Sequence, residues 1–194
     1  MSYRHARAAL LTGAALVLAT CGGGGGSDDS APTPITSFEL LDPNPGAGNR
    51  FGQDVAILAN GNVVVTAPRD STVAPNSGAV HLYNPRTQAR IASIFGDTAN
   101  DQLGSRGVTA LANGNFVIAS QNDDVGGVVD AGSVMLFNGA TGAQIGSTIA
   151  GTFTDDVVLA KVTGSATGDF YVLGLGRADK NGVVDSGLAR VIAQ

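Results

Sequence analysis

VAILANGNVVVTA occupies residues 55–67, and nearly the same pattern, VTALANGNFVIAS, occupies residues 108–120. A second block, SGAVHLYN at 77–84, follows the first copy and returns as AGSVMLFN at 131–138. The two blocks recur with offsets of 53 and 54 residues. Ordered blocks that recur at one period are typical of a protein assembled from similar structural units.

A third, more divergent copy follows the first two. GDFYVLGLG at 168–176 matches GNFVIAS at an offset of 54, and DSGLARVI at 185–192 matches DAGSVMLF at an offset of 55. We therefore place three copies at about 51–103, 104–156 and 157–194. A chain of 194 residues has room for one such domain with a short extension.

Each copy predicts four short strands. In the first copy they are 55–58, 62–67, 79–83 and 90–95. Large apolar residues alternate with smaller or polar ones in the third strand, which is the period of a strand with unlike faces. The expected fold class is all-β, a partial β-propeller of about three four-stranded antiparallel blades after a disordered N-terminal tether.

The first two strands of a copy are joined by an Asn-Gly dipeptide, Asn60-Gly61 in the first copy and Asn113-Gly114 in the second. Asn and Gly both tolerate positive φ, which a two-residue type I′ hairpin requires at both central positions. The sequence therefore predicts type I′ turns at these two places.

The strand count leaves a surplus at one end and a deficit at the other. Residues 35–41, ITSFELL, align with a fourth strand, whereas the third copy supplies strands only at 157–161, 169–175 and 188–192. Three blades are fewer than the four to eight of a closed propeller. Two alternatives remain: a gene fragment that forms an open monomeric arc, or a homodimer that completes a six-bladed ring by exchanging residues 35–41.

The repeats resemble those of bacterial secreted and surface β-propellers related to the FG-GAP repeat of integrin α chains. The resemblance is carried by the repeated NGN-x-VV and GAV motifs and by Phe51-Gly52 and Leu103-Gly104, which stand where that family has its Phe-Gly pair. It implies a propeller fold without implying a reaction. Blades of this family commonly serve adhesion, and some hold Ca²⁺ in an Asp-rich loop.

Residues 1–20 have the features of a secretory signal peptide. Arg4 and Arg7 precede an uncharged, mostly apolar run at 8–20, which is too short to span a bilayer. The run ends in LATC, which resembles the bacterial lipobox and implies lipidation of Cys21, the only cysteine. The alternative is an ordinary signal peptide with an incidental cysteine.

Residues 21–34 then form a Gly/Ser/Asp/Pro linker, which predicts a flexible tether between the lipid and a repeat domain at 35–194. The expected location is the bacterial cell envelope, with the membrane as a partner through the lipid anchor. Gly22, where sorting signals of similar lipoproteins carry Asp for inner-membrane retention, favours the outer membrane or cell surface.

The charge balance and histidine content exclude several classes of function. The chain has 11 basic against 16 acidic residues, so we expect no nucleic-acid binding. His81 is the only histidine after the signal peptide and aligns with Met135, which predicts a residue on a strand face. No His/Cys cluster suggests zinc or iron. We expect no enzymatic activity, with a hydrolase as a third and remote alternative.

Calcium is the one cofactor that the sequence suggests, because closely spaced Asp and Asn residues offer the hard oxygen ligands that it requires. The candidate ligands lie between the second and third strands of two copies: Asp123, Asp124 and Asp130 in the second, and Asp179, Asn181 and Asp185 in the third. The alternative is Asp/Asn/Gly turns held by side-chain-to-backbone bonds. The leading function is an interaction, adhesion or structural surface module; the runner-up binds an extracellular protein or glycan with calcium.

Overall fold

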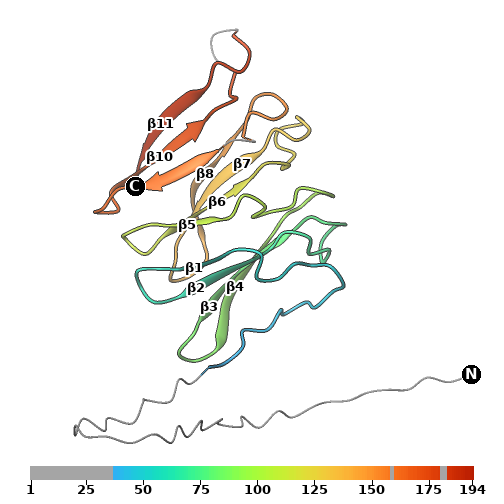
Figure 1. Cartoon of the computed structure of the whole chain (residues 1–194), viewed down its shortest axis with the longest axis vertical. Helices are drawn as coiled ribbons and strands as arrows, with labels where there is room; N and C mark the ends of the chain where they lie inside the picture. Colours follow the sequence, from blue (N-terminus) through green and yellow to red (C-terminus); the bar gives the residue numbers. More distant parts are fainter. Residues whose placement is uncertain (1–36, 158–159, 180–182) are drawn as a thin grey trace, which may run out of the picture. The chain divides into compact units, whose positions relative to one another are not determined.

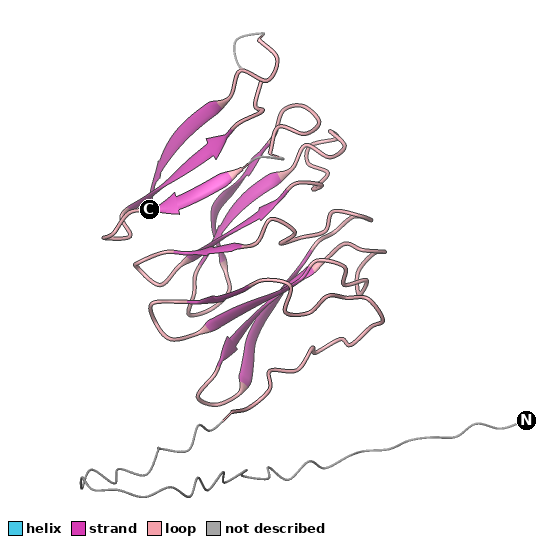
Figure 2. Cartoon of the chain, viewed as in Figure 1, coloured by secondary structure: helices cyan, strands magenta, loops and turns pink. Residues whose placement is uncertain are grey.

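The structure, a computed structural model, describes residues 37–157, 160–179 and 183–194. Over these ranges the chain forms strands, turns and loops without a helix (Figure 2). Accordingly, no helix in the described part has the length and hydropathy to cross a membrane. The predicted signal peptide, the tether and Cys21 lie outside the described residues.

Within the described ranges, eleven strands form three antiparallel sheets, each built from consecutive strands (Figure 1). The first sheet has the order β1 (Val55–Ile57), β2 (Val63–Ala67), β3 (Ala79–Asn84), β4 (Ala89–Phe95). The second has β5 (Val108–Ala110), β6 (Phe116–Ser120), β7 (Ser133–Phe137), β8 (Gln144–Ala150). The third has β9 (Lys161–Gly164), β10 (Phe170–Leu175), β11 (Leu188–Ala193). The predicted all-β, blade-like architecture is confirmed.

The sheets pack face to face within the unit Glu39–Gln194. The first strands of successive sheets, β1, β5 and β9, contact one another in turn. Alternate residues of β6 serve two cores, because Phe116 and Ile118 pack toward the first sheet while Val117 packs toward the third. The period-two pattern of the sequence thus encodes a central sheet that is buried on both faces.

The third copy differs from the prediction at its first strand. Residues 157–161 were expected to form it, whereas β9 runs from Lys161 to Gly164. Val157 is instead fully buried between the second and third sheets, as Leu103 is buried between the first and second. An apolar run of this length contains both a buried connecting residue and part of a strand, and local pattern does not separate them.

The register of β10 also differs from the sequence alignment by one residue. The alignment of GDFYVLGLG with GNFVIAS pairs Phe170 with Phe116. In the structure Tyr171 faces the core as Phe116 does, with 2% of its surface exposed, while Phe170 is 41% exposed. A shift of one residue moves every side chain of a strand to the other face.

Residues 37–41 form no strand, although residues 35–41 were predicted to do so; residues 35 and 36 lie outside the described part. The Leu41 carbonyl accepts a hydrogen bond of 2.9 Å from the Tyr83 hydroxyl, which ties this segment to β3. The third sheet has three strands, as expected from the deficit in the third copy.

The predicted type I′ turns are wrong. In each of these two turns the glycine has positive φ, 86° at Gly61 and 87° at Gly114, but the preceding asparagine does not. The amide of Gly61 donates to the Leu58 carbonyl at 2.8 Å, which closes a type I turn before the glycine. This is the three-residue hairpin with a glycine bulge, in which Asn60 occupies an ordinary right-handed position.

The asparagines of these hairpins also join neighbouring sheets. The side-chain amides of Asn60 and Asn62 both donate to the Gly139 carbonyl of the second sheet, at 2.9 and 2.8 Å. In the next copy Asn113 and Asn115 both donate to the Gln194 side chain, at 2.8 and 3.1 Å. We use the name Asn-Gly-Asn clamp for the two asparagine side-chain amides on either side of the hairpin glycine in each of these copies.

We expect Gly114→Val to lower the free energy of unfolding by about 1–3 kcal/mol, because a β-branched residue is strained at positive φ. The added Cβ itself meets only Asn60, at 3.7 Å or more, so backbone strain and not a clash is the cause. Urea unfolding measures the loss. Gly174→Ala is the control, because that position has no positive φ and an added Cβ there meets the Lys161 carbonyl at an ordinary contact distance of 3.9 Å. Equal stability of Gly114→Val and the parent would contradict the strain argument.

Candidate functional site

The loop after the second strand of each sheet begins at an equivalent position in all three copies. The carbonyls of Asp70, Asp123 and Ala178 each accept a hydrogen bond from the glycine before the following strand, at 2.9, 2.9 and 3.0 Å. Asp70 is fully buried and Asp123 is 9% exposed. The first two copies therefore place a carboxylate where the third has a methyl group.

In the second copy two further carboxylates reach the same place. Asp97 and Asp101 come from the loop after β4, and one oxygen of each lies within 4.8 Å of the others and of an Asp123 oxygen. Asp101 is 1% exposed, and its carboxylate accepts bonds from the backbone and hydroxyl of Thr98. We call these three residues the acidic cluster.

The acidic cluster is electrostatically unfavourable without a proton or a cation. Burial raises the pKa of Asp123, and the charges of Asp101, Asp97 and Asp124 raise it further, against a lowering contribution from the Ser133 hydroxyl. Ser133 is fully buried, and its Oγ makes no hydrogen bond of good geometry. The site therefore holds more oxygen acceptors than donors.

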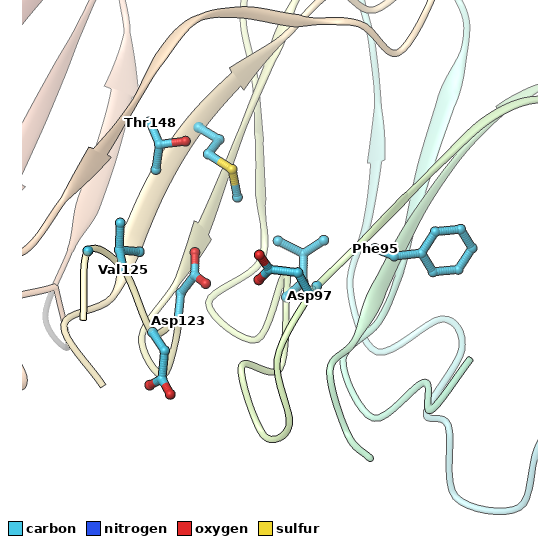
Figure 3. A pocket seen from close by; sticks show the side chains of 10 residues that line it. Phe95, Asp97, Asp123, Val125 and Thr148 are labelled. Atoms are coloured by element: carbon cyan, nitrogen blue, oxygen red, sulfur yellow. The ribbon is translucent and has the colours of Figure 1, made fainter. Parts of the chain in front are cut away.

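A cavity of about 360 Å³ adjoins the acidic cluster. Figure 3 shows Asp97 and Asp123 at this cavity together with Val125 and Thr148, while the Phe95 ring points away from it. Its volume leaves room for water and for part of a polar ligand beside the carboxylates. Both apolar and carboxylate groups line it, as is common in ligand sites.

Most of the calcium ligands predicted from the sequence have other partners. In the second copy the Asp124 carboxylate accepts the Asp130 amide at 2.8 Å, and Asn122 donates to the Asp130 carboxylate at 3.1 Å. Of the predicted residues in this loop, only Asp123 belongs to the acidic cluster.

The third-copy loop follows the same pattern. The Asp179 carboxylate accepts the Asp185 amide at 2.7 Å, and Arg177 forms an ion pair of 3.2 Å with Asp185. Asn181 lies outside the described residues. Sequence reasoning missed Asp97 and Asp101 because they come from a different loop. Their signal is a D-x-x-x-D motif that ends two residues before Leu103.

His81 lies in the middle of β3, on the face away from the second sheet, and is fully buried. Its Nδ1 is 2.8 Å from Ser93 Oγ on β4. The rings of Phe51, Phe95 and Tyr83 surround it with centroid distances of 5.9, 6.1 and 6.4 Å. The prediction of a strand residue was right, but the sequence did not show what the ring meets.

Two known repeat families match parts of the chain. The FG-GAP repeat matches residues 39–83, which contain β1, β2 and all of β3 except Asn84. A repeat of unknown function (DUF5650) matches residues 110–150, from the end of β5 through β8. None of the curated proteins compared matches the chain. The matches fall on the first and second sheets, as for a β-propeller-like repeat protein, and FG-GAP repeats are generally non-catalytic modules.

Proposed function

We propose that this chain is a lipid-anchored, extracytoplasmic module of the bacterial envelope that binds another extracellular molecule through its propeller-type sheets. The observation that carries the proposal is the FG-GAP match on the first sheet, since this repeat is typical of surface and interaction modules. The signal-like residues 1–20 and Cys21 supply the expected route to the envelope.

The loops between the second and third strands supply a surface for binding. Each carries an exposed valine: Val73 is 55% exposed in the first copy, Val129 63% in the second and Val184 73% in the third. We take these repeated exposed valines as the contacts to test, because an apolar residue recurs on the equivalent loop of every copy.

A cell-binding assay tests the proposal. The full chain with Cys21→Ser is immobilised, and adhesion of bacterial and host cells to it is measured. We expect adhesion that falls when Val73, Val129 and Val184 are replaced together by serine. Replacing Ile91, which is 37% exposed on β4, is the matched control. Absence of binding by the parent chain, or equal binding by both variants, contradicts the proposal.

The lipid anchor gives a separate prediction. Cys21→Ser is expected to move the protein from the membrane fraction to the soluble fraction or to block its processing, because one thiol carries the acyl chains. Fractionation with detergent-phase partition and intact-mass measurement checks this. Unchanged partition at the normal mature mass would show that Cys21 is incidental.

Calcium-dependent binding is the second candidate function, and the acidic cluster favours it. Three carboxylates within 4.8 Å and an adjoining cavity suit a hard cation better than the predicted loops do. We expect millimolar Ca²⁺ to raise the melting temperature and chelation to reverse this, with loss of the effect in Asp101→Asn. A melting temperature insensitive to calcium removes this candidate.

A further inference from the structure

A second cluster of ligand-type side chains lies on the outer face of the first sheet. Asp42 comes from the segment before β1, Asp70 from the loop after β2, and His81 from β3. One carboxylate oxygen of each aspartate and one ring nitrogen of His81 all lie within 4.8 Å of one another. Asp70 and His81 are fully buried, and Asp42 is half-buried.

The His81 ring has one nitrogen occupied and one free. Nδ1 forms a hydrogen bond with Ser93 Oγ, while Nε2 is buried and has no hydrogen-bond partner. A buried polar atom without a partner is unusual in a folded protein and calls for a missing partner such as an ion. Histidines that bind a metal through one ring nitrogen are commonly oriented by a hydrogen bond at the other nitrogen, as Ser93 provides here at Nδ1.

Burial and the neighbouring carboxylates act on the ring in opposite directions. Burial lowers the pKa of His81, and Arg90 adds to this, whereas Asp42 and Asp70 act in the opposite direction. A neutral imidazole that donates from Nδ1 to Ser93 has its lone pair on Nε2, and a metal ligand needs such a lone pair.

We propose that Asp42, Asp70 and His81 bind a divalent first-row transition metal ion, with Zn²⁺ as the representative. Two carboxylates and one imidazole are an accepted donor set for such ions, and the two negative charges balance the ion. The imidazole distinguishes this site from a calcium site, which takes oxygen ligands. Metal–ligand bonds of about 2.0–2.2 Å require the three groups to move together slightly.

Asn49 holds the two carboxylates together in the metal-free site. Its Nδ2 donates to Asp42 Oδ2 at 3.0 Å, to the Asn44 carbonyl at 2.8 Å and to Asp70 Oδ2 at 3.4 Å. An entering cation would replace the amide hydrogens at the two carboxylates.

The second copy supports the assignment by contrast. Asp101 precedes Leu103-Gly104 by the same spacing as Asn49 precedes Phe51-Gly52, and Met135 of β7 stands where β3 has His81. That copy is therefore all-carboxylate, whereas the first copy alone combines carboxylates with an imidazole. The metal ion would fix the segment before β1 to the sheet, so binding should stabilise the folded state.

Titration of the full chain tests the proposal. All variants carry Cys21→Ser so that no thiol binds the metal. Calorimetry measures Zn²⁺ binding, and visible absorption measures Co²⁺ binding. The melting temperature is measured with each of the two ions. We expect one bound Zn²⁺ per chain, a rise in melting temperature and Co²⁺ bands of a nitrogen/oxygen site. His81→Met, which copies the second repeat, should weaken Zn²⁺ binding at least about 100-fold, and Ser93→Ala about 10-fold.

Two further variants make the test decisive. Asp42→Asn leaves the buried strand intact and should also weaken Zn²⁺ binding, so the proposal is tested even where His81→Met does not fold. Asp101→Asn, in the acidic cluster, should bind Zn²⁺ as the parent does. Failure of the parent to bind, or equal binding by the parent, His81→Met and Asp42→Asn, overturns the proposal.

Discussion

Phe116→Ala is expected to lower the free energy of unfolding by about 3–5 kcal/mol, the usual cost of removing a fully buried aromatic ring from a core. Phe116 is completely buried between the first and second sheets and stacks on Phe137 with a centroid distance of 5.5 Å. Denaturant unfolding followed by circular dichroism measures the loss.

Phe170→Ala is the matched control, because the sequence alignment pairs the two phenylalanines while the structure exposes 41% of Phe170. We expect a loss of about 1 kcal/mol or less for Phe170→Ala, and a loss near that of Phe116→Ala for Tyr171→Ala. The reverse order for Phe170 and Tyr171 would mean that β10 has the register of the sequence alignment.

Asp156→Ala is expected to cost about 2–4 kcal/mol, because it leaves several backbone donors without an acceptor. The Asp156 carboxylate is 3% exposed and accepts the amides of Thr152, Phe153 and Asp179 at 2.7, 3.0 and 3.3 Å, as well as the Thr152 hydroxyl at 3.0 Å. Asp169→Ala is the control, since that side chain is exposed. Equal stability of the two variants contradicts the expectation.

The same carboxylate predicts a pH dependence. Burial raises the pKa of Asp156, but the hydrogen bonds from Thr152, Phe153 and Asp179 outweigh it and leave the pKa lowered. The unfolded chain therefore binds the proton more readily, so the stabilisation is present above about pH 4 and is lost as the pH falls through the lowered pKa. The stability gap between the parent and Asp156→Asn should shrink over that range.

Much of the fold follows from the sequence, because a period-two pattern and a 53–55-residue repeat restrict the chain to stacked antiparallel sheets. The register of β10 did not follow from the sequence. Phe170 and Tyr171 are adjacent aromatic residues, and either side chain is large and apolar enough to fill the core position. The type of the Asn60-Gly61 turn did not follow either, because glycine at positive φ suits both hairpin classes.

The candidate sites were less predictable than the fold. Asp123 was singled out from its own loop, whereas its partners Asp97 and Asp101 precede it by more than twenty residues. His81 was assigned to a strand face, and only the folded chain brings Asp42 and Asp70 to it. Contacts between residues so far apart in the sequence depend on how the loops pack in the folded chain. The spacing of residues within one loop does not encode that packing.

The Asn-Gly-Asn clamp has a consequence for how such a gene changes over evolutionary time. The two amides lie in one copy, and their acceptors, the Gly139 carbonyl and the Gln194 side chain, lie in the next. A tandem duplication of one period of DNA would therefore insert a copy that already carries the donors for its successor. Blade number can then grow or shrink by unequal recombination without the origin of a new interface.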